Sequence, residues 1–312
     1  MSPGFLHFSQ LVVTGLVIGS VYALVALGFV LIYKATSVIN FAQGEFVLMG
    51  AYICLWVVAD MQIPFVWAFL ITMAFSVVLG LLVERLMLRP LIGEPIITVI
   101  MVTIGLATVL KSIVTLFWGT QIRVFHQIFP QEPLRFQGIV VSEVYLWTFG
   151  FALFFMAVFA AFFKYSRAGI AMRATADDQQ VAQSMGISVK RIFAISWCIA
   201  AVVSAVGGML IGNINGINIT LADFGLKVFP AVILGGLDSI VGAIIGGLAI
   251  GILENLMGGY LDIYFGGGVK EVAPFVVLVV ILMIKPYGLF GTVEIERVLQ
   301  SHSTKRNVFY PR

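Results

Sequence analysis

The sequence predicts an all-α polytopic membrane protein, a bundle of about eight transmembrane helices in which one glycine-rich segment is broken or re-entrant. The composition, the apolar runs and the positions of the basic residues predict this fold. Of the 312 residues, 61% are hydrophobic and 11% are charged, whereas a soluble domain carries about 25% charged residues. A water-soluble fold of this length could not cover so much apolar surface, so lipid is the expected solvent.

The apolar runs give the expected helices in order, because a bilayer core takes about 20 apolar residues per helix. The expected spans are residues 11–32, 46–59 (beginning near Asn40), 64–83, 96–118, 145–163, 192–212 and 272–284. Between the last two lies a glycine-rich region, 228–257, which Gly235 and Gly236 interrupt. Gly-x-x-x-Gly pairs at 15–19 and 247–251 are expected to be close packing faces.

Basic residues orient these spans, because cytoplasmic loops retain Lys and Arg. The loop 167–191 is rich in both, so it is expected inside, and counting back places the N-terminus outside. The chain then reads as one membrane domain, 1–291, followed by a cytoplasmic tail, 292–312. Region 228–257 must enter from outside and return, either as a half-helix or broken pair around Gly235–Gly236 or as a tight hairpin without a role in transport.

The inside loop 167–191 is polar but patterned. Thr175 is expected to cap a short helix, with Asp178 as a capping-box partner and Gly186 ending the helix. Asp178, Ala182 and Gly186 are spaced at i, i+4 and i+8, so they share one face. An apolar stripe adjoins that face: Val181 and Met185. The small-residue face is suited to docking in a partner's groove, and a helix lying on the membrane surface is the alternative.

Four sequence strings resemble one transporter family. They are Arg173-Ala-Thr-Ala-Asp-Asp178 with Ala182, Met185 and Gly186; Ile39-Asn-Phe-Ala-Gln-Gly-Glu45; Leu234-Gly-Gly-Leu-Asp-Ser-Ile-Val-Gly-Ala243; and Lys285-Pro-Tyr-Gly-Leu-Phe-Gly291. They are similar to the signatures of branched-chain amino-acid (LIV-type) permeases of ABC importers, closest to the smaller permease of the high-affinity system. Gln43 stands for the usual His, Asp238 for a usual Gly, and Gln180 for the Glu of the general coupling-loop motif.

The resemblance implies a type II importer-like permease in a bacterial cytoplasmic (inner) membrane. It implies two ABC ATPase subunits, a second homologous permease chain and a periplasmic solute-binding protein as partners, besides membrane lipid, and no nucleic acid. No cofactor is expected, since the partner subunits use ATP. Branched-chain or related hydrophobic amino acids are the expected cargo, and urea or short amides are the alternative. The expected ATPase-coupling residues are Arg173, Asp178, Ala182, Met185 and Gly186.

Seven residues are candidates for the translocation pathway: Asn40, Phe41, Gln43, Glu45, Gly235, Gly236 and Glu254. A carboxylate within the membrane is costly unless it is paired or wet. Glu45 is therefore expected either to line the inner end of the pathway or to pair at the interface with Lys34 or an Arg. Glu254 is expected to face the bundle, and Lys111 to extend its stem toward the outer surface.

Some chemistry is absent from the sequence. It has no G-x-x-x-x-G-K-[ST] phosphate loop, so ATP hydrolysis by that route must belong to another subunit. No nucleophile–base constellation is visible and the His residues are scattered, so neither a catalytic nor a metal site is predicted. An ion-coupled secondary transporter would show buried charge relays and an inverted repeat, neither of which stands out. A passive channel would leave the patterned loop without a task.

Overall fold

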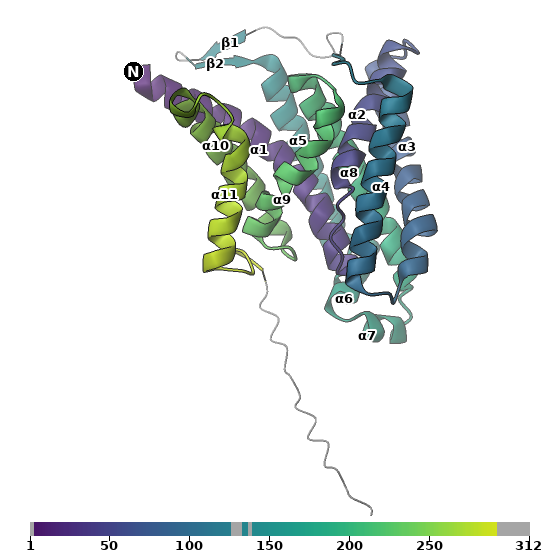
Figure 1. The fold of residues 1–312 in the computed structure, drawn as a ribbon. Helices are drawn as coiled ribbons and strands as arrows, with labels where there is room; N and C mark the ends of the chain where they lie inside the picture. Colours follow the sequence, from purple (N-terminus) through teal and green to yellow (C-terminus); the bar gives the residue numbers. More distant parts are fainter. Residues whose placement is uncertain (1–2, 126–132, 137–138, 292–312) are drawn as a thin grey trace, which may run out of the picture.

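A computed structural model describes residues 3–125, 133–136 and 139–291, which form a bundle of membrane helices (Figure 1). The longer helices are α1 (Pro3–Thr36), α2 (Gln43–Ala59), α3 (Phe65–Val83), α4 (Ile96–Trp118), α5 (Glu143–Tyr165), α8 (Val189–Asn215), α10 (Ile240–Phe265) and α11 (Val269–Ile284). Shorter helices join them: α6 (Arg167–Asp177), α7 (Gln179–Ser184) and α9 (Asp223–Gly235), with a 3-10 turn at Ile219–Ala222. The predicted tail, 292–312, lies outside the described residues.

Within the described residues, six helices are long and apolar enough to cross a membrane. They contain α1, α3, α4, α5, α8 and α10, and α2 is a shorter apolar helix. The N-terminus lies at the end of the bundle opposite α6 and α7 (Figure 1). These helices confirm the prediction of a helical, multi-pass membrane protein.

Helix α1 runs through the centre of the bundle, and 94% of its most apolar 18-residue stretch is buried. Its glycines contact α10 backbone to backbone: a Cβ on Gly251 would lie 2.3 Å from Gly19 Cα, and a Cβ on Gly247 would lie 2.4 Å from the Ala23 nitrogen. Lipid provides little hydrophobic drive between helices, so such close packing is a main source of association. The Gly-x-x-x-Gly pairs are therefore packing faces, as predicted.

The glycine-rich region forms α9 and α10, with a turn between them. Helix α9 ends at Gly235, Gly236 has a φ of +106°, and α10 begins at Ile240. Only glycine adopts that φ without strain. The 13 residues of α9 span about 20 Å at ~1.5 Å per residue, less than the ~30 Å hydrocarbon core. Helix α9 is thus a half-length helix beside a full-length one.

Two features depart from the all-α prediction or were not foreseen. Strands β1 (Pro133–Phe136) and β2 (Ile139–Ser142) form an antiparallel hairpin, with Pro133 opposite Ser142, before α5. After α3, the helix widens into a π-helical turn, Glu84–Leu88, and then a 3-10 turn, Arg89–Leu91. The wide turn lets Arg89 reach Glu84 five residues back, with bonds of 3.1 and 2.9 Å. This pairing satisfies a carboxylate that is 1% exposed.

Candidate functional site

The short helix α7 is capped by Asp178 rather than by Thr175. Asp178 Oδ1 accepts from the backbone N–H of Gln180 at 2.7 Å and of Val181 at 2.9 Å. Thr175 lies inside α6, 1% exposed, and its hydroxyl donates to the Ala171 carbonyl. The expectation that Thr175 begins the helix is therefore wrong: α6 continues through it because its hydroxyl bonds back within the helix, and the carboxylate three residues on provides the cap.

The two faces of α7 differ from the expected docking arrangement. Ala182 is only 3% exposed and packs onto its own chain, whereas Val181 and Met185 are 59% and 79% exposed. Ala182 therefore packs α7 against the rest of the chain, and the apolar stripe of Val181 and Met185 faces outward. Gly186 ends the helix with a φ of +83°, and the Ile187 N–H returns to the Ala182 carbonyl.

Arg173 joins this segment to the membrane helix before it. Its guanidinium donates to the Phe163 carbonyl and, at 3.2 Å, to the Lys164 carbonyl. It also lies over the Phe163 ring, with the guanidinium carbon 5.4 Å from the ring centroid. The last carbonyls of a helix lack intrahelical partners and attract cations. Arg173 therefore fixes α6 to the end of α5, so that a displacement of α6 would also move the end of α5.

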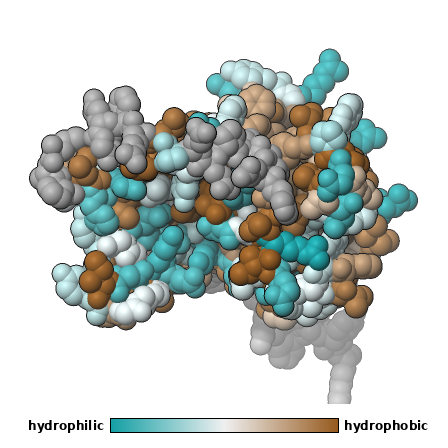
Figure 2. Space-filling model, turned by 90° about the horizontal axis from the view of Figure 1, so that it is seen from above, coloured by the Kyte–Doolittle hydropathy of each residue, from teal (hydrophilic) through white to brown (hydrophobic). Residues whose placement is uncertain are grey.

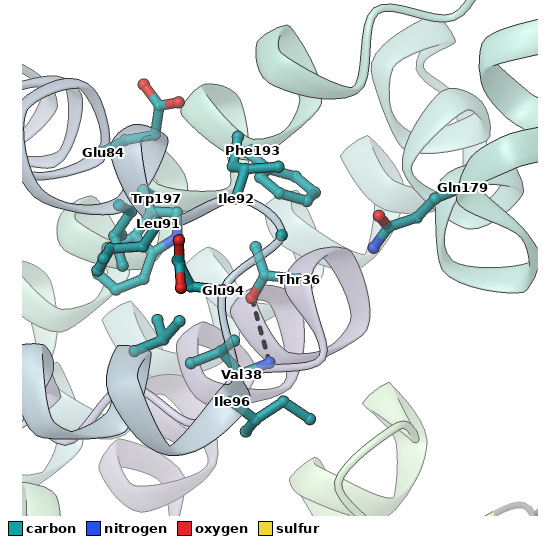
Figure 3. A pocket seen from close by; sticks show the side chains of 13 residues that line it. Thr36, Val38, Glu84, Leu91, Ile92, Glu94, Ile96, Gln179, Phe193 and Trp197 are labelled. Carbon is teal, nitrogen blue, oxygen red and sulfur yellow. Dashed lines mark hydrogen bonds between the residues drawn. The ribbon is translucent and has the colours of Figure 1, made fainter.

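A cavity of about 120 Å³ lies beside α7, between it and the segment that joins α3 to α4. Figure 3 shows Gln179 of α7 directed toward this cavity, across from Trp197 and Phe193 of α8. Ile92 and Glu94 line the same space from the connecting segment. The first residue of α7 thus borders an open space between α8 and the segment that joins α3 to α4.

Replacing Asp178 by alanine should weaken α7 specifically. The two cap bonds would be lost, at a cost of about 1 kcal/mol of helix stability, and hydrogen exchange at Gln180 and Val181 should accelerate. Asp178→Ser keeps a capping oxygen and should exchange almost as slowly as the wild type. Equal exchange in Asp178→Ala and the wild type would contradict the capping role.

Charged side chains from α2, α4 and α9 converge in the membrane part of the bundle. Lys111 Nζ lies 3.5 Å from Asp223 Oδ1, so Lys111 has a partner and does not simply extend outward. Glu45 is 8% exposed, and its neighbour Gly44 packs against Ala222 and Gly225, which flank Asp223. Among the ion pairs of the described residues, none joins Glu45 to Lys34 or to an Arg. We call Glu45, Lys111 and Asp223 the charged cluster.

Asn40 and Gln43 lie level with the middle of α8. The Asn40 side chain donates to Gln43 Oε1 at 3.0 Å, and Gln43 Nε2 donates to Ser204 Oγ at 2.6 Å. Ser204 lies near the middle of α8. Asn40 and Gln43 are 1% and 0% exposed, so their amides form hydrogen bonds with each other and with α8 and do not face solvent. Phe41 is half-buried, with its ring 6.0 Å from that of Phe229 on α9.

Gly235 and Gly236 lie where two of the four family-like sequence strings, 234–243 and 285–291, contact each other. The Leu289 N–H donates to the Leu234 carbonyl at 2.8 Å, and the Phe290 N–H donates to the Gly235 carbonyl at 3.1 Å. A Cβ on Gly236 would lie 2.5 Å from the Gly291 nitrogen. The segment after α11 is therefore fastened to the α9–α10 turn, a contact that no local sequence signal could reveal.

Glu254 is buried inside the bundle, 2% exposed, and accepts a 2.5 Å hydrogen bond from the Tyr22 hydroxyl of α1. The Tyr22 ring packs on Phe224 of α9, with ring centroids 4.8 Å apart. Glu254 therefore faces the bundle as predicted, and it links α10 through α1 to the half-helix α9.

Viewed from the N-terminal end, hydrophilic residues gather between the lobe of α10 and α11 and the lobe of α2, α3 and α4 (Figure 2). Hydrophobic residues lie along the outer side of the second lobe (Figure 2). Helix α9 lies between the two lobes (Figure 1), and ion pairs join it to both. Lys111–Asp223 reaches α4, and Lys227–Glu271, at 3.2 Å, reaches α11.

The family described as "Branched-chain amino acid transport system / permease component" matches residues 11–285. The chain belongs to this family. Permease components of this kind are not enzymes, and the ATPase of their transporters is a separate subunit. As a permease component whose described residues include six helices apolar enough to cross a membrane, the chain is a multi-pass protein of the bacterial inner membrane.

Named relatives agree with the family. The high-affinity branched-chain amino acid transport system permease protein LivH of Escherichia coli K12 is 32% identical over 318 residues, covering 96% of this chain and all of the relative. BraD of Pseudomonas aeruginosa, from a system described in the same words, is 30% identical over 310 residues, with 95% and 100% covered. The probable LivH of Methanocaldococcus jannaschii is 29% identical over 297 residues, with 90% and 92% covered.

A solved structure shares the fold. A chain of PsaBC from Streptococcus pneumoniae, solved in complex with Fab, superposes with a TM-score of 0.50 at 15% identity, covering 90% of this permease and 93% of that chain. The similarity concerns the architecture of the helices alone.

Proposed function

We propose that this permease forms one half of the translocation pathway of an ATP-driven importer for branched-chain amino acids. The family match over 11–285 carries this proposal, and the exposed apolar stripe on α7, at the end of the bundle opposite the N-terminus, supports it. One of two ATPase subunits would receive Val181 and Met185 of α7. A periplasmic solute-binding protein would deliver the amino acid at the other end.

The orientation follows from charge. The segment 164–191, with α6 and α7, is rich in Lys and Arg, so it lies in the cytoplasm by the positive-inside rule. The N-terminus then lies outside and the segment after α11 inside. Helix α9 begins at mid-depth beside the start of α2 and ends at Gly235, next to the segment after α11, and α10 returns from there as a full span. This half-helix is the broken segment of the bundle.

A second, homologous permease chain would complete the pathway. Helix α4 presents small and hydroxyl residues on one exposed face: Gly105, Thr108 and Ser112. A Cβ on Gly105 would meet nothing within 4 Å, so that face is open within this chain. Small residues at membrane depth favour close helix contact. The second chain would therefore pack near α4 and α9, enclosing the polar surface between the lobes.

The charged cluster is the part of the pathway that fits the cargo. An amino acid carries an ammonium and a carboxylate, and the cluster offers both complementary charges, Lys111 and the carboxylates Glu45 and Asp223, beside the half-helix. Uncompensated charge is costly at membrane depth, so the cluster would ease passage of a zwitterion. Urea and short amides have no such pair of charges, which makes them the second candidate cargo.

Uptake by the reconstituted transporter tests this function. The permease, its homologous partner chain, the ATPases and the binding protein are placed in liposomes, and uptake of radiolabelled leucine is measured. Uptake should require ATP inside the liposomes and be competed by isoleucine and valine but not by urea or acetamide. Uptake driven by an ion gradient without ATP would instead support a secondary transporter, and competition by urea would support the amide cargo.

Reversing the charged cluster should test its place on the pathway. Lys111→Glu puts a third carboxylate beside Glu45 and Asp223, and like charges in a low-dielectric site repel strongly. Leucine uptake should fall at least tenfold, while ATPase assembly is unchanged. The double variant Lys111→Glu, Asp223→Lys restores an opposite pair and should recover part of the uptake. Equal loss of uptake in the single and the double variant would contradict a role for the opposite charges of this pair in transport.

A further inference from the structure

A groove of about 690 Å³ opens among α2, α3 and α4, in the half of the bundle toward the N-terminal end. Small-molecule sites occupy roughly 300–1,000 Å³. Most of the groove is lined by apolar and aromatic side chains: Met49, Ile53 and Trp56 of α2, Phe75 of α3, and Ile113, Phe117 and Trp118 of α4. The lining is thus that of a site for a long apolar chain.

The remaining two lining residues are oppositely charged. Arg123 Nη1 lies 3.9 Å from Asp60 Oδ2, and their side chains are 39% and 50% exposed. Asp60 directly follows α2, and the backbone of Arg123 is fixed by two hydrogen bonds with Ile217, of 2.8 and 2.7 Å. The charges therefore lie just beyond the helix ends, at the level of the lipid head groups, with the apolar groove beneath them.

The groove lies nearer the N-terminal end of the bundle than the charged cluster, because Met49 and Ile53 follow Glu45 along α2 and Ile113 follows Lys111 along α4. Ile113 is two positions from Lys111, about 200° around a helix, so the two side chains leave α4 on opposite flanks. The other wall, α3, exposes large apolar side chains, among them Val66, Leu70, Val78 and Leu82. Since a membrane helix with such a surface faces lipid, the α3 side of the groove opens toward the bilayer.

We propose that this groove binds one phospholipid whose head group carries both a phosphate and a primary ammonium, of the phosphatidylethanolamine type. The phosphate is bound by the Arg123 guanidinium, whose planar fork suits phosphate oxygens. The ammonium is bound by the Asp60 carboxylate, and an acyl chain lies along the aromatic lining. A lipid with a phosphate but no ammonium, such as phosphatidylglycerol, leaves Asp60 facing a second negative charge.

Native mass spectrometry of the complete transporter tests the site. The complex is purified from bilayers with equal amounts of phosphatidylethanolamine and phosphatidylglycerol. The wild type should retain one phosphatidylethanolamine per copy of this permease. Arg123→Gln and Asp60→Asn should each retain roughly tenfold less, since each loses a hydrogen bond to a charged group. Ile113→Trp should also lose the lipid, because it fills the groove while leaving both charges.

Lys270→Gln is the matched control. Lys270 is a basic residue at the same end of the bundle, on α11, and does not line the groove. Its variant should retain lipid like the wild type. Equal retention of both lipids, undiminished retention in Ile113→Trp, or displacement of the lipid by free leucine would each overturn the proposal. The last outcome would assign the groove to cargo. Uptake of leucine by the wild type is measured separately, so failure of the lipid site leaves the transport function untouched.

Discussion

Replacing Met185 by aspartate should abolish ATP-driven uptake while leaving the membrane bundle intact. Met185 is 79% exposed and its neighbour Val181 is 59% exposed, although both are apolar and lie at the polar end of the molecule. An apolar side chain buried at an interface contributes about 1.5–3 kcal/mol, and a carboxylate there also has to be desolvated. We expect the affinity for the ATPase subunits to fall by roughly tenfold to a hundredfold.

The control for this variant lies on the same helix. Gln183 is exposed but is two positions from Val181 and from Met185, about 200° around α7. Gln183→Asp introduces the same charge on the opposite side and should leave uptake nearly unchanged. Co-purification of the ATPases and uptake of leucine are measured for both variants. Normal uptake in Met185→Asp, or equal loss in Gln183→Asp, would contradict docking through the apolar stripe.

The Ala182→Arg variant distinguishes packing of α7 on its own chain from docking of α7 on the ATPase. Because Ala182 is buried against its own chain, an arginine there would lift α7 from the bundle and not merely block its outer face. Uptake should also be lost, but hydrogen exchange throughout α7 should rise, whereas in Met185→Asp it should stay slow. The structure thus turns a single expected coupling face into two faces with different tasks.

The sequence predicted the helices well, because hydropathy and helix stops are local. The run 96–118 coincides with α4, which Pro95 precedes and Gly119 follows with a φ of +75°. The helix break at Gly235–Gly236 was also predicted, since two adjacent glycines in an apolar run weaken a helix. These signals lie within a few residues of the feature that they determine.

Partners in the site could not be predicted in the same way. Lys111 and Asp223 are 112 residues apart, and Gln43 and Ser204 are 161 residues apart. Which polar groups meet depends on how the helices cross, and neither hydropathy nor spacing reports the crossing. The same reason applies to Glu45, whose surroundings depend on how α2 crosses α8.

Replacing Gly251 by leucine should prevent the permease from accumulating in the membrane. A Cβ at Gly251 would lie 2.3 Å from Gly19 Cα and 2.4 Å from the Gly19 nitrogen. These are backbone atoms of α1, so no change of rotamer relieves the contact, and α10 must move away from the central helix. Overpacking of a fitted core costs about 1–3 kcal/mol, and this contact lies at the upper end because the backbone itself obstructs.

Gly150→Leu is the matched control for this variant. Gly150 lies within α5, is exposed, and a Cβ there would meet nothing within 4 Å, so the added side chain extends toward lipid. Both substitutions remove a glycine from a helix, which alone stabilises helices by up to about 1 kcal/mol. Membrane abundance and the midpoint of thermal unfolding should therefore fall sharply for Gly251→Leu and hold or rise for Gly150→Leu. Should the two variants accumulate equally, the α1–α10 contact is not what holds the centre of this bundle together.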